Sequence, residues 1–585
     1  MARHMERYLR RIAKMIGDPA LLRYAKRLHE PRMLQKFIWI FLRSMTGYVF
    51  SLAANKFGPS FQRRIVKRRA VSLDHNALKG LPPYDLIEKQ SEKGRLVIKL
   101  ATMETDLDQS LFDAKYEDEE DLFAANRFYW IFPLLHERSD IKVHSAVKQS
   151  ILDWIKTHPR PENIGIFEPY SVSERCIAWL TFLCFAKGRL DFAEEDLSLV
   201  TASIGRQLRY LIDNLEFRGA MTNNHVLNDA RCLYFCGIAF GDTFLKSTAR
   251  AVLSRYFDKI IIDGCLNEGS SHYQHLITMK FLELLKLAER KGDRQAIEWL
   301  RPRVGRMLGV CGNLQSEHDS DVYPLFGDTS PDVTPKWLSG WPFSKERARL
   351  SNWCGLFGSE SVPASEVRDQ RRGFRKLSKG AFEVWLVTKD NGMGCHGHHD
   401  NASFVLYYQG IPIIADPGLF SYAPGAVADL QRSSSLHGGP VTGALWDPPK
   451  NTFVSHSGLR SSVKVRQERD SVECDVVSFD DALAAKRTIE MGDEVVAIRD
   501  RVVRDIFGNK AAGCLLCLYP SVEPEEMDDG VFIPCVGLRI TTNADMKIEN
   551  TPFSGKYGSL CGTKSIVISY LAETELKIKF ERLAQ

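Results

Sequence analysis

The hydrophobic pattern of the chain changes at about residue 365, and this change constrains the fold more than any other feature. From about residue 122 to residue 310, apolar residues recur at i, i+3, i+4 and i+7, which indicates amphipathic helices. The clearest examples lie at 126–136, 145–158, 173–188, 199–217 and 279–292. Because these helices follow one another with short connections, we expect paired antiparallel helices in a bundle or a toroid.

The second half of the chain has the pattern of strands. Short runs rich in Val, Ile and Tyr are bounded by Gly, Pro, Asn or Asp, which is typical of an antiparallel β-sandwich. They lie at 380–389, 402–410, 411–416, 494–503, 513–520 and 565–572. A length of 585 residues suits two or three domains. We expect a basic helical N-terminal segment (1–75), a helical domain (76–365) and a β-sandwich domain (366–585).

The first 120 residues carry weaker signals. The N-terminus is basic but lacks an apolar core and a small-residue cleavage site, so we predict no signal peptide and a cytoplasmic location, with the periplasm as the alternative. The apolar stretch Phe37–Phe50 is interrupted by Arg43 and is too short to span a membrane. We interpret it as a core helix, or alternatively as a membrane-surface contact helped by the basic residues at 63–69. The acidic run Tyr116–Asp121 reads as a solvated linker.

Charge and cysteine content exclude some classes of function. The net charge of +5 is too small to indicate nucleic-acid binding, but it suits an anionic substrate. The 13 cysteines have no metal-finger spacing, and several, such as Cys232 and Cys236, lie in apolar runs. We therefore expect buried free thiols and a reducing compartment.

Two polar clusters fall in the helical half. Asn224 and His225 follow Asn223 at a predicted helix start, where an asparagine is commonly a helix cap. Glu268 and Tyr273 lie in a Gly/Ser-rich stretch with two histidines that opens the next helix, although Tyr273 could equally be a core aromatic residue.

Two more clusters fall in the β half. His396, His398, His399 and Asp400 precede a strand, and a surface histidine cluster is the alternative to a site. Further along the chain are Asp416, Arg432 and His437. Histidine and aspartate are ligands that zinc or a similar divalent ion accepts, so His398, Asp416 and His437 together are a candidate metal site.

The order of these clusters resembles the heparinase II/III-like polysaccharide lyases, which include alginate and oligoalginate lyases. The matching motifs run from about residue 220 to 440 and comprise Asn224-His225, Glu268-Gly-Ser-Ser-His-Tyr273-Gln-His275, His396-Gly-His398-His-Asp400-Asn-Ala-Ser403-Phe404, Asp416-Pro-Gly418 and Arg432 with His437. The resemblance implies an N-terminal (α/α) toroid followed by a C-terminal antiparallel β-sandwich. Two departures are Gly438, where the family often has Asn, and His399, where it often has a small residue.

The resemblance also implies roles for individual residues. Asn224 and His225 look like the pair that binds and neutralises a uronate carboxylate, and Tyr273 looks like the catalytic tyrosine. His396 looks like its partner from the sandwich. Glu268 and Arg432 would assist in substrate binding. The metal ligands would be His398, Asp416 and His437, holding a divalent ion, zinc by preference, in a structural role.

β-Elimination explains why these residue types would be needed. The C5 proton of a uronate is a poor acid until donors stabilise the charge that develops on the carboxylate, and then a base and an acid must act. Tyr273 alone could do both, or His396 could be the base and Tyr273 the acid. The substrate would be an anionic uronate polysaccharide of heparan, hyaluronan, alginate or bacterial exopolysaccharide type.

Two other classes of function are open from the residues alone. A glycoside hydrolase on a helical toroid would need two carboxylic acids, for which Glu268 and Asp328 are candidates. A non-catalytic glycan-binding protein of polysaccharide biosynthesis would explain the missing signal peptide.

Overall fold

The computed structural model describes Leu73 and residues 96–339, 373–389, 396–440, 462–477, 483–503 and 513–581. Short gaps fall at 108, 113, 138–139, 163–164, 188, 218–221, 320, 424 and 571–572. The predicted N-terminal segment 1–75, except Leu73, and the predicted domain junction at 365–366 lie outside the described residues. So does the apolar stretch Phe37–Phe50.

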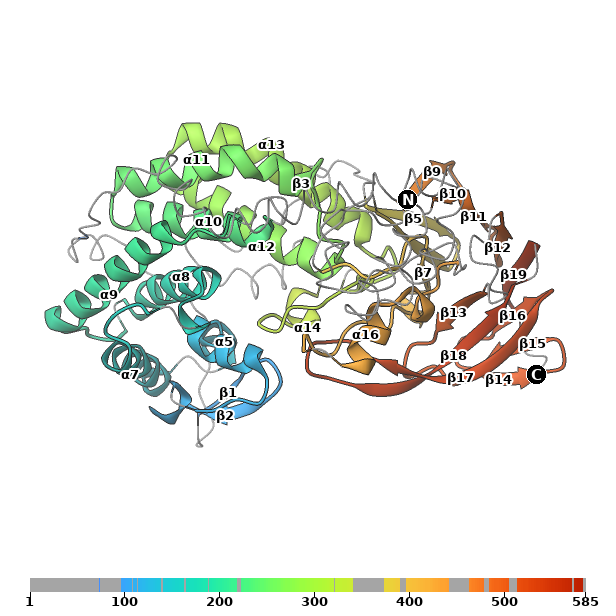
Figure 1. Ribbon diagram of the computed structural model, residues 1–585, viewed down its shortest axis with the longest axis horizontal. Helices are drawn as coiled ribbons and strands as arrows, with labels where there is room; N and C mark the ends of the chain where they lie inside the picture. The colour runs from blue at the N-terminus through green and yellow to red at the C-terminus, as the bar shows by residue number, and fades with distance from the viewer. Residues whose placement is uncertain are drawn as a thin grey trace, which may run out of the picture.

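The first half is helical, as predicted. Its helices form an open arc on one side of the molecule (Figure 1). They are α5 (Glu119–Arg127), α6 (Ile131–Glu137), α7 (Ile141–Thr157), α8 (Pro169–Ala186), α9 (Glu194–Asp213), α10 (Asn224–Ala239), α11 (Thr243–Ile260), α12 (Ser271–Arg290), α13 (Arg294–Leu314) and the short α14 (Pro335–Leu338). Neighbours in this series pack together: α8 contacts α5, α9 and α10, while α12 contacts α10 and α13.

One short hairpin precedes these helices and another connects α11 to α12. Two small hairpins are formed by β1 (Val97–Lys99) with β2 (Glu104–Asp106) and by β3 (Ile261–Ile262) with β4 (Cys265–Leu266). Asp140 and Asp242 cap the starts of α7 and α11 by accepting hydrogen bonds from backbone N–H groups in the first turn. These two helices therefore begin where the sequence supplies a capping side chain.

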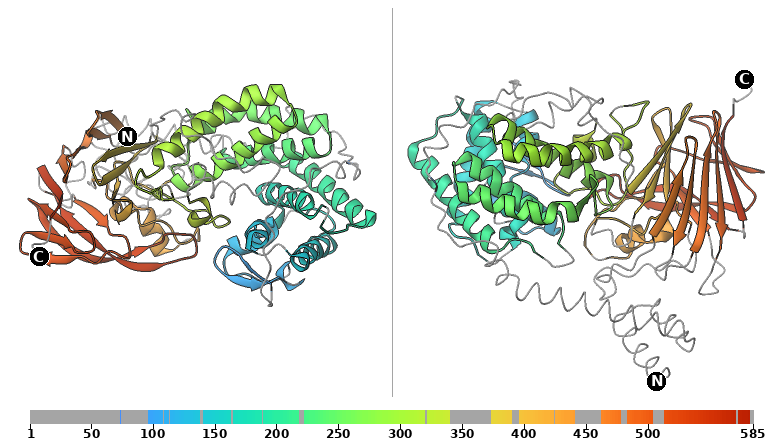
Figure 2. Two further views of the ribbon diagram at one scale, coloured as in Figure 1. Left: turned by 180° about the vertical axis from the view of Figure 1, so that it is seen from behind. Right: turned by 90° about the horizontal axis from the view of Figure 1, so that it is seen from above.

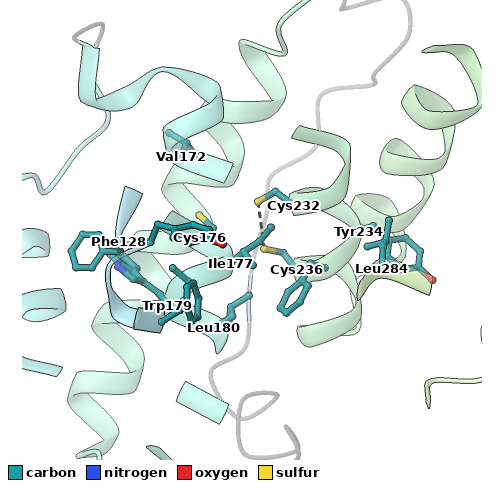
Figure 3. Close-up of a cluster of buried hydrophobic side chains, with 14 of the residues drawn as sticks. Phe128, Val172, Cys176, Ile177, Trp179, Leu180, Cys232, Tyr234, Cys236 and Leu284 are labelled. Carbon is teal, nitrogen blue, oxygen red and sulfur yellow. Dashed lines mark hydrogen bonds between the residues drawn. The ribbon is translucent and has the colours of Figure 1, made fainter. Parts of the chain in front are cut away.

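The core of the helical half is apolar and contains free thiols, as the sequence predicts. Figure 3 shows Cys176 on α8 facing Cys232 and Cys236 on α10, among large aromatic and aliphatic side chains. The Cys232 and Cys236 sulfur atoms lie 3.9 Å apart, and no solvent reaches either residue. Burial raises the pKa of both thiols, so they behave as small apolar groups.

The second half is a β-sandwich, and its two layers are seen edge-on in Figure 2. One layer is an eight-stranded sheet of order β14-β15-β16-β19-β12-β11-β10-β9. The bounds of its strands are β9 (Ser462–Gln467), β10 (Ser471–Val477), β11 (Leu483–Met491), β12 (Val495–Val502), β14 (Glu525–Met527), β15 (Gly530–Ile533), β16 (Leu538–Thr542) and β19 (Glu573–Phe580).

The other layer contains two antiparallel sheets. Their orders are β5-β6-β7-β8 and β13-β18-β17, and a bridge between Ile414 and Leu518 joins them. The strands are β5 (Gly373–Lys379), β6 (Phe382–Thr388), β7 (Phe404–Tyr408), β8 (Ile411–Ile414), β13 (Gly513–Cys517), β17 (Asp545–Phe553) and β18 (Cys561–Ser569). Apolar side chains from both layers form one core, so the predicted fold class of a toroid followed by a β-sandwich is confirmed.

Two local predictions are wrong. The run 126–136 is not one helix, because Phe128 adopts a left-handed conformation (φ 60°) that ends α5 before α6 begins. The acidic run Tyr116–Asp121 is not a solvated linker. Asp118 caps α5, and the buried Asp121 accepts hydrogen bonds from the backbone and hydroxyl of Thr102. Asp118 and Asp121 thus stabilise α5, the first helix of the arc.

The two halves touch at several points. One contact joins the start of α12 to the segment that carries His396, and another joins Asp118 to Tyr557 in the turn between β17 and β18. None of the helices within the described ranges is long and apolar enough to cross a bilayer.

Candidate active site

Tyr273 lies in the first turn of α12, at the contact between the two halves. The helix begins where the hydroxyl of Ser270 accepts a hydrogen bond from the Tyr273 backbone N–H (3.1 Å). The same Ser270 hydroxyl donates to the carbonyl of Asp328 (2.7 Å). One capping residue therefore fixes both the catalytic candidate and a loop from farther along the chain.

His396, from the β half, stacks on the Tyr273 ring. The two ring centroids are 3.6 Å apart and the planes differ by 8°. Tyr273 is 7% exposed and His396 9% exposed, so both rings are largely covered. The structure thus brings together the pair that the motifs predicted, one from each half of the chain.

Asp328 holds the histidine segment in place. Its carboxylate contacts His396 Nδ1 (3.1 Å) through one oxygen and His398 Nε2 (2.9 Å) through the other. The backbones of the two segments are also in close contact. A Cβ added at Gly327 (φ +72°) would lie 2.5 Å from the carbonyl oxygen of His396. Burial alone would raise the pKa of Asp328, but the two histidines hold it well below its usual range.

Glu268 connects the other predicted residues to this pair. Its carboxylate accepts from the Asn224 backbone N–H (2.7 Å) and side-chain amide (2.5 Å), and it lies 3.6 Å from His396 Nε2. An asparagine amide has two N–H groups, so one remains for a ligand. Asn223, and not Asn224, caps α10.

His225 lies beside Asn224 with partners of its own. Its Nδ1 is 3.0 Å from the carboxylate of Glu216, and its ring lies against Tyr170 with centroids 4.6 Å apart. The His225 side chain is 24% exposed, so it remains open to solvent. Arg432 joins the site only indirectly, because its guanidinium donates to the carbonyl of Ser421, next to Tyr422.

Tyr422 is a residue that the motif analysis missed. Its hydroxyl lies 2.9 Å from the Tyr273 hydroxyl, and its ring contacts Tyr557. Burial raises the pKa of Tyr273 to about 12, although His396 and the Tyr422 hydroxyl act in the opposite direction. His396 therefore lowers this pKa, but by less than burial raises it.

His398, Asp416 and His437 form the cluster that the sequence predicted as a metal site. One ligand atom from each residue lies within 4.8 Å of the other two, and all three residues are buried. His398 Nε2 faces Asp328 and His437 Nε2 faces the Gln431 carbonyl, so each ring directs Nδ1 toward Asp416. Within the described residues, His398 Nδ1 has no hydrogen-bond partner. Two imidazole nitrogens and a carboxylate fit a divalent ion.

Sequence reasoning had considered Asp328 only as a hydrolase acid and had not considered Tyr170, Glu216 or Tyr422. Tyr170, Glu216 and Tyr422 lie in segments without a recognisable motif, and Asp328 and Tyr422 meet their partners through contacts that are distant in sequence. The nearest sequence signal is the Gly-Asp-Thr-Ser stretch at 327–330, whose glycine indicates a tight backbone approach.

Fold and site together define a two-domain protein in which a tyrosine of a helical toroid meets a histidine of a β-sandwich. The comparisons with known proteins agree. The family model described as "Heparinase II/III N-terminus" matches residues 93–342, and "Heparinase II/III-like, C-terminal" matches residues 370–577. The chain belongs to the heparinase II/III-like family of polysaccharide lyases, which confirms the resemblance.

Solved structures show the same fold at low sequence identity. Heparinase III is 17% identical, with 90% of this chain and 89% of that chain covered and a TM-score of 0.58. A heparan sulfate lyase HepC mutant from Pedobacter heparinus is 16% identical, with 97% and 92% covered and a TM-score of 0.54. A comparison with curated proteins gives no match.

Proposed function

We propose that this protein cleaves a uronic-acid-containing polysaccharide by β-elimination and leaves 4,5-unsaturated uronate ends. The observation that carries the proposal is the stacked pair of Tyr273 and His396, with Asn224 and Glu268 beside it. Proton-transfer groups and carboxylate-binding groups therefore lie in one site. The heparan sulfate lyase and heparinase III folds make heparan-type polymers the first substrates to test.

Carboxylate binding is supported by the elements as well as by the side chains. Tyr170, His225 and Tyr273 each lie in the first turn of a long helix, namely α8, α10 and α12. The N-terminus of a helix carries a partial positive charge and favours anions. The second N–H of Asn224 and the His225 ring would stabilise the charge that develops when the C5 proton leaves.

For proton transfer, the geometry favours Tyr273. Both nitrogens of His396 face carboxylates, Asp328 at 3.1 Å and Glu268 at 3.6 Å, which suits a charged imidazolium more than a free base. Such a cation stacked on Tyr273 would stabilise the phenolate that remains when the phenol gives up its proton to solvent. Tyr273 would then take the C5 proton and return a proton to the leaving O4, with the Tyr422 hydroxyl at 2.9 Å as its neighbour.

The metal site fits a structural zinc ion held by His398, Asp416 and His437. When bound, the ion would fix the orientation of His398. Asp328 contacts both His398 and His396, so the same ion would help to hold His396 against Tyr273.

The hydrolase alternative is less well supported by the same geometry. Glu268 and Asp328 are the two candidate acids, but both are buried. Their oxygens are used by Asn224, His396 and His398. A hydrolase needs both carboxyl groups free to face the scissile bond.

The proposal predicts that ultraviolet absorbance of unsaturated uronate will rise when the protein is incubated with the right polymer. Tyr273→Phe removes the hydroxyl and keeps the ring, so turnover should fall by about 10²–10⁴-fold, the usual contribution of a general acid–base group. The matched control is Tyr234→Phe, which removes a hydroxyl bonded to Asp293, toward the opposite end of α10 from His225, and should keep its activity.

New reducing ends without the unsaturated chromophore would favour the hydrolase instead. Full activity in Tyr273→Phe would show that the roles assigned here are wrong.

A further inference from the structure

Tyr170 lies beside the carboxylate-binding pair without any assigned role. It is the second residue of α8, is 7% exposed, and packs its ring against His225 with centroids 4.6 Å apart. The Arg127 guanidinium lies over the same ring, 5.1 Å from its centroid. Tyr170 therefore shares one wall of the site with His225.

Behind Tyr170 lies a buried ammonium group. Lys280 on α12 donates to the Tyr170 hydroxyl oxygen (2.7 Å) and pairs with Glu174 (2.8 Å). Glu174 in turn pairs with Arg231, and all three charged side chains are at most 4% exposed. Lys280 remains paired with Glu174 whether or not Tyr170 is present, so its contact with the phenol is not needed to satisfy its charge.

The direction of the Tyr170 hydrogen bond decides what the phenol can do. A lysine ammonium only donates, so the Tyr170 oxygen accepts at that contact. The hydroxyl proton must then point elsewhere, and among the described residues it has no acceptor. A buried donor without a partner is rare and calls for an explanation. Burial and the nearby Glu174 raise the pKa of Tyr170 well above its usual value, so the phenol keeps this proton.

We propose that Tyr170 is a third hydrogen-bond donor to the uronate carboxylate, beside Asn224 and His225. This inference rests on the proposed lyase function. The ammonium of Lys280 polarises the phenol and sets the direction of its proton. The acceptor that completes the arrangement is a carboxylate oxygen of the bound sugar.

The test is a binding experiment in the Tyr273→Phe background, in which bound sugar is not consumed. Titration calorimetry would measure the Kd of a uronate oligosaccharide and of the same oligosaccharide with its carboxylates reduced to hydroxymethyl groups. Tyr170→Phe should weaken binding of the uronate form by about 10-fold or more, as expected for a hydrogen bond to a charged group. The reduced form should bind equally well with and without the Tyr170 hydroxyl.

Tyr234→Phe in the same background is the matched control, because it removes a buried tyrosine hydroxyl away from the site. It should change neither Kd, and thermal unfolding should show that both variants fold. Equal weakening of both ligands by Tyr170→Phe, or no weakening of either, would overturn the inference. A parent protein that binds no uronate oligosaccharide at all would overturn the proposed function together with it.

Discussion

At the scale of single residues, Asp328 shows how one carboxylate can couple two kinds of chemistry. One oxygen contacts a predicted metal ligand, His398, and the other contacts the predicted catalytic His396. The residue is 1% exposed and makes both contacts within 3.1 Å. The same carboxylate therefore orients both the His396 ring that stacks on Tyr273 and the His398 ring.

Asp328→Asn should weaken metal binding and lower kcat together, each by about 10–100-fold, as is usual for a group that orients a metal-binding histidine. An amide cannot accept from both histidines, so one contact is lost. Metal affinity can be measured by competition with a chromophoric chelator, and kcat by the unsaturated product. Asp319→Asn, in an exposed loop nearby in sequence, is the control. Loss of kcat with unchanged metal affinity would show that the two sites are not coupled.

Gly438 shows what sequence alone could not explain at this scale. This residue is one of the two positions at which the motifs depart from the pattern of the family. In the structure, a Cβ at Gly438 would lie 3.3 Å from the Phe404 carbonyl, and the buried Arg487 donates to the Gly438 carbonyl. Arg487 also pairs with Asp500, its neighbour across β11 and β12 in the eight-stranded sheet. The glycine therefore belongs to a close contact between layers that no local motif reveals.

At the scale of elements, the first turns of α8, α10 and α12 all contribute residues to the site. Each places a polar side chain of the site in its first turn: Tyr170, His225 and Tyr273. The start of α12 also contains two buried histidines, and burial lowers the pKa of His272 to about 3 and of His275 to about 4. These two histidines fill the core behind Tyr273 in their neutral form.

The two histidines should make stability depend on pH. In the unfolded chain they gain protons below about pH 6.5, whereas in the fold they do so only near pH 3–4. The free energy of unfolding should therefore be highest above pH 6.5 and fall as the pH decreases from 6.5 to 4. Chemical denaturation followed by circular dichroism would measure this slope.

His275→Asn keeps a donor for the Ser271 carbonyl but does not titrate, so it should flatten the slope. His318→Asn, on an exposed loop, should leave the slope unchanged. A slope that stays the same in His275→Asn would contradict the assignment to this histidine.

Hydrophobic periodicity predicted the existence of these helices better than it predicted the residues at which they begin. The runs at 173–188 and 279–292 correspond to α8 and α12, but both helices begin earlier in the chain. The earlier turns contain Tyr170 and Tyr273, and their polar residues interrupt the apolar pattern. The functional part of each helix is thus the part that amphipathic patterning does not reveal.

At the scale of the whole molecule, the site exists only where the arc and the sandwich meet. Ser270, Asp328 and His396 join the two halves through hydrogen bonds that span up to 68 residues of sequence. The motifs predicted which residues would be involved. The contacts of Ser270 and Asp328 that hold the stacked pair in place could not be read from the sequence, because loops without secondary structure make them.

Removal of the metal with a chelator should lower both the midpoint of thermal unfolding and the activity, and added zinc should restore both. The reason is that His398, Asp416 and His437 come from separate segments of the sandwich half, and His398 is linked to the helical half through Asp328. Calorimetry and product absorbance would follow the two effects. In His437→Ala, which already lacks a ligand, the chelator should have little further effect. Equal chelator effects in His437→Ala and the parent would place the metal elsewhere.

The hydroxyl of Tyr557 donates to Asp118, at the other end of the described chain, and accepts from the backbone N–H of Tyr422. Tyr422, the neighbour of Tyr273, is thus held by a residue of the β half that is itself bonded to the helical half. A fragment of the chain that stops before residue 557 lacks this contact, so it should hold Tyr422 beside Tyr273 less firmly than the longer chain does.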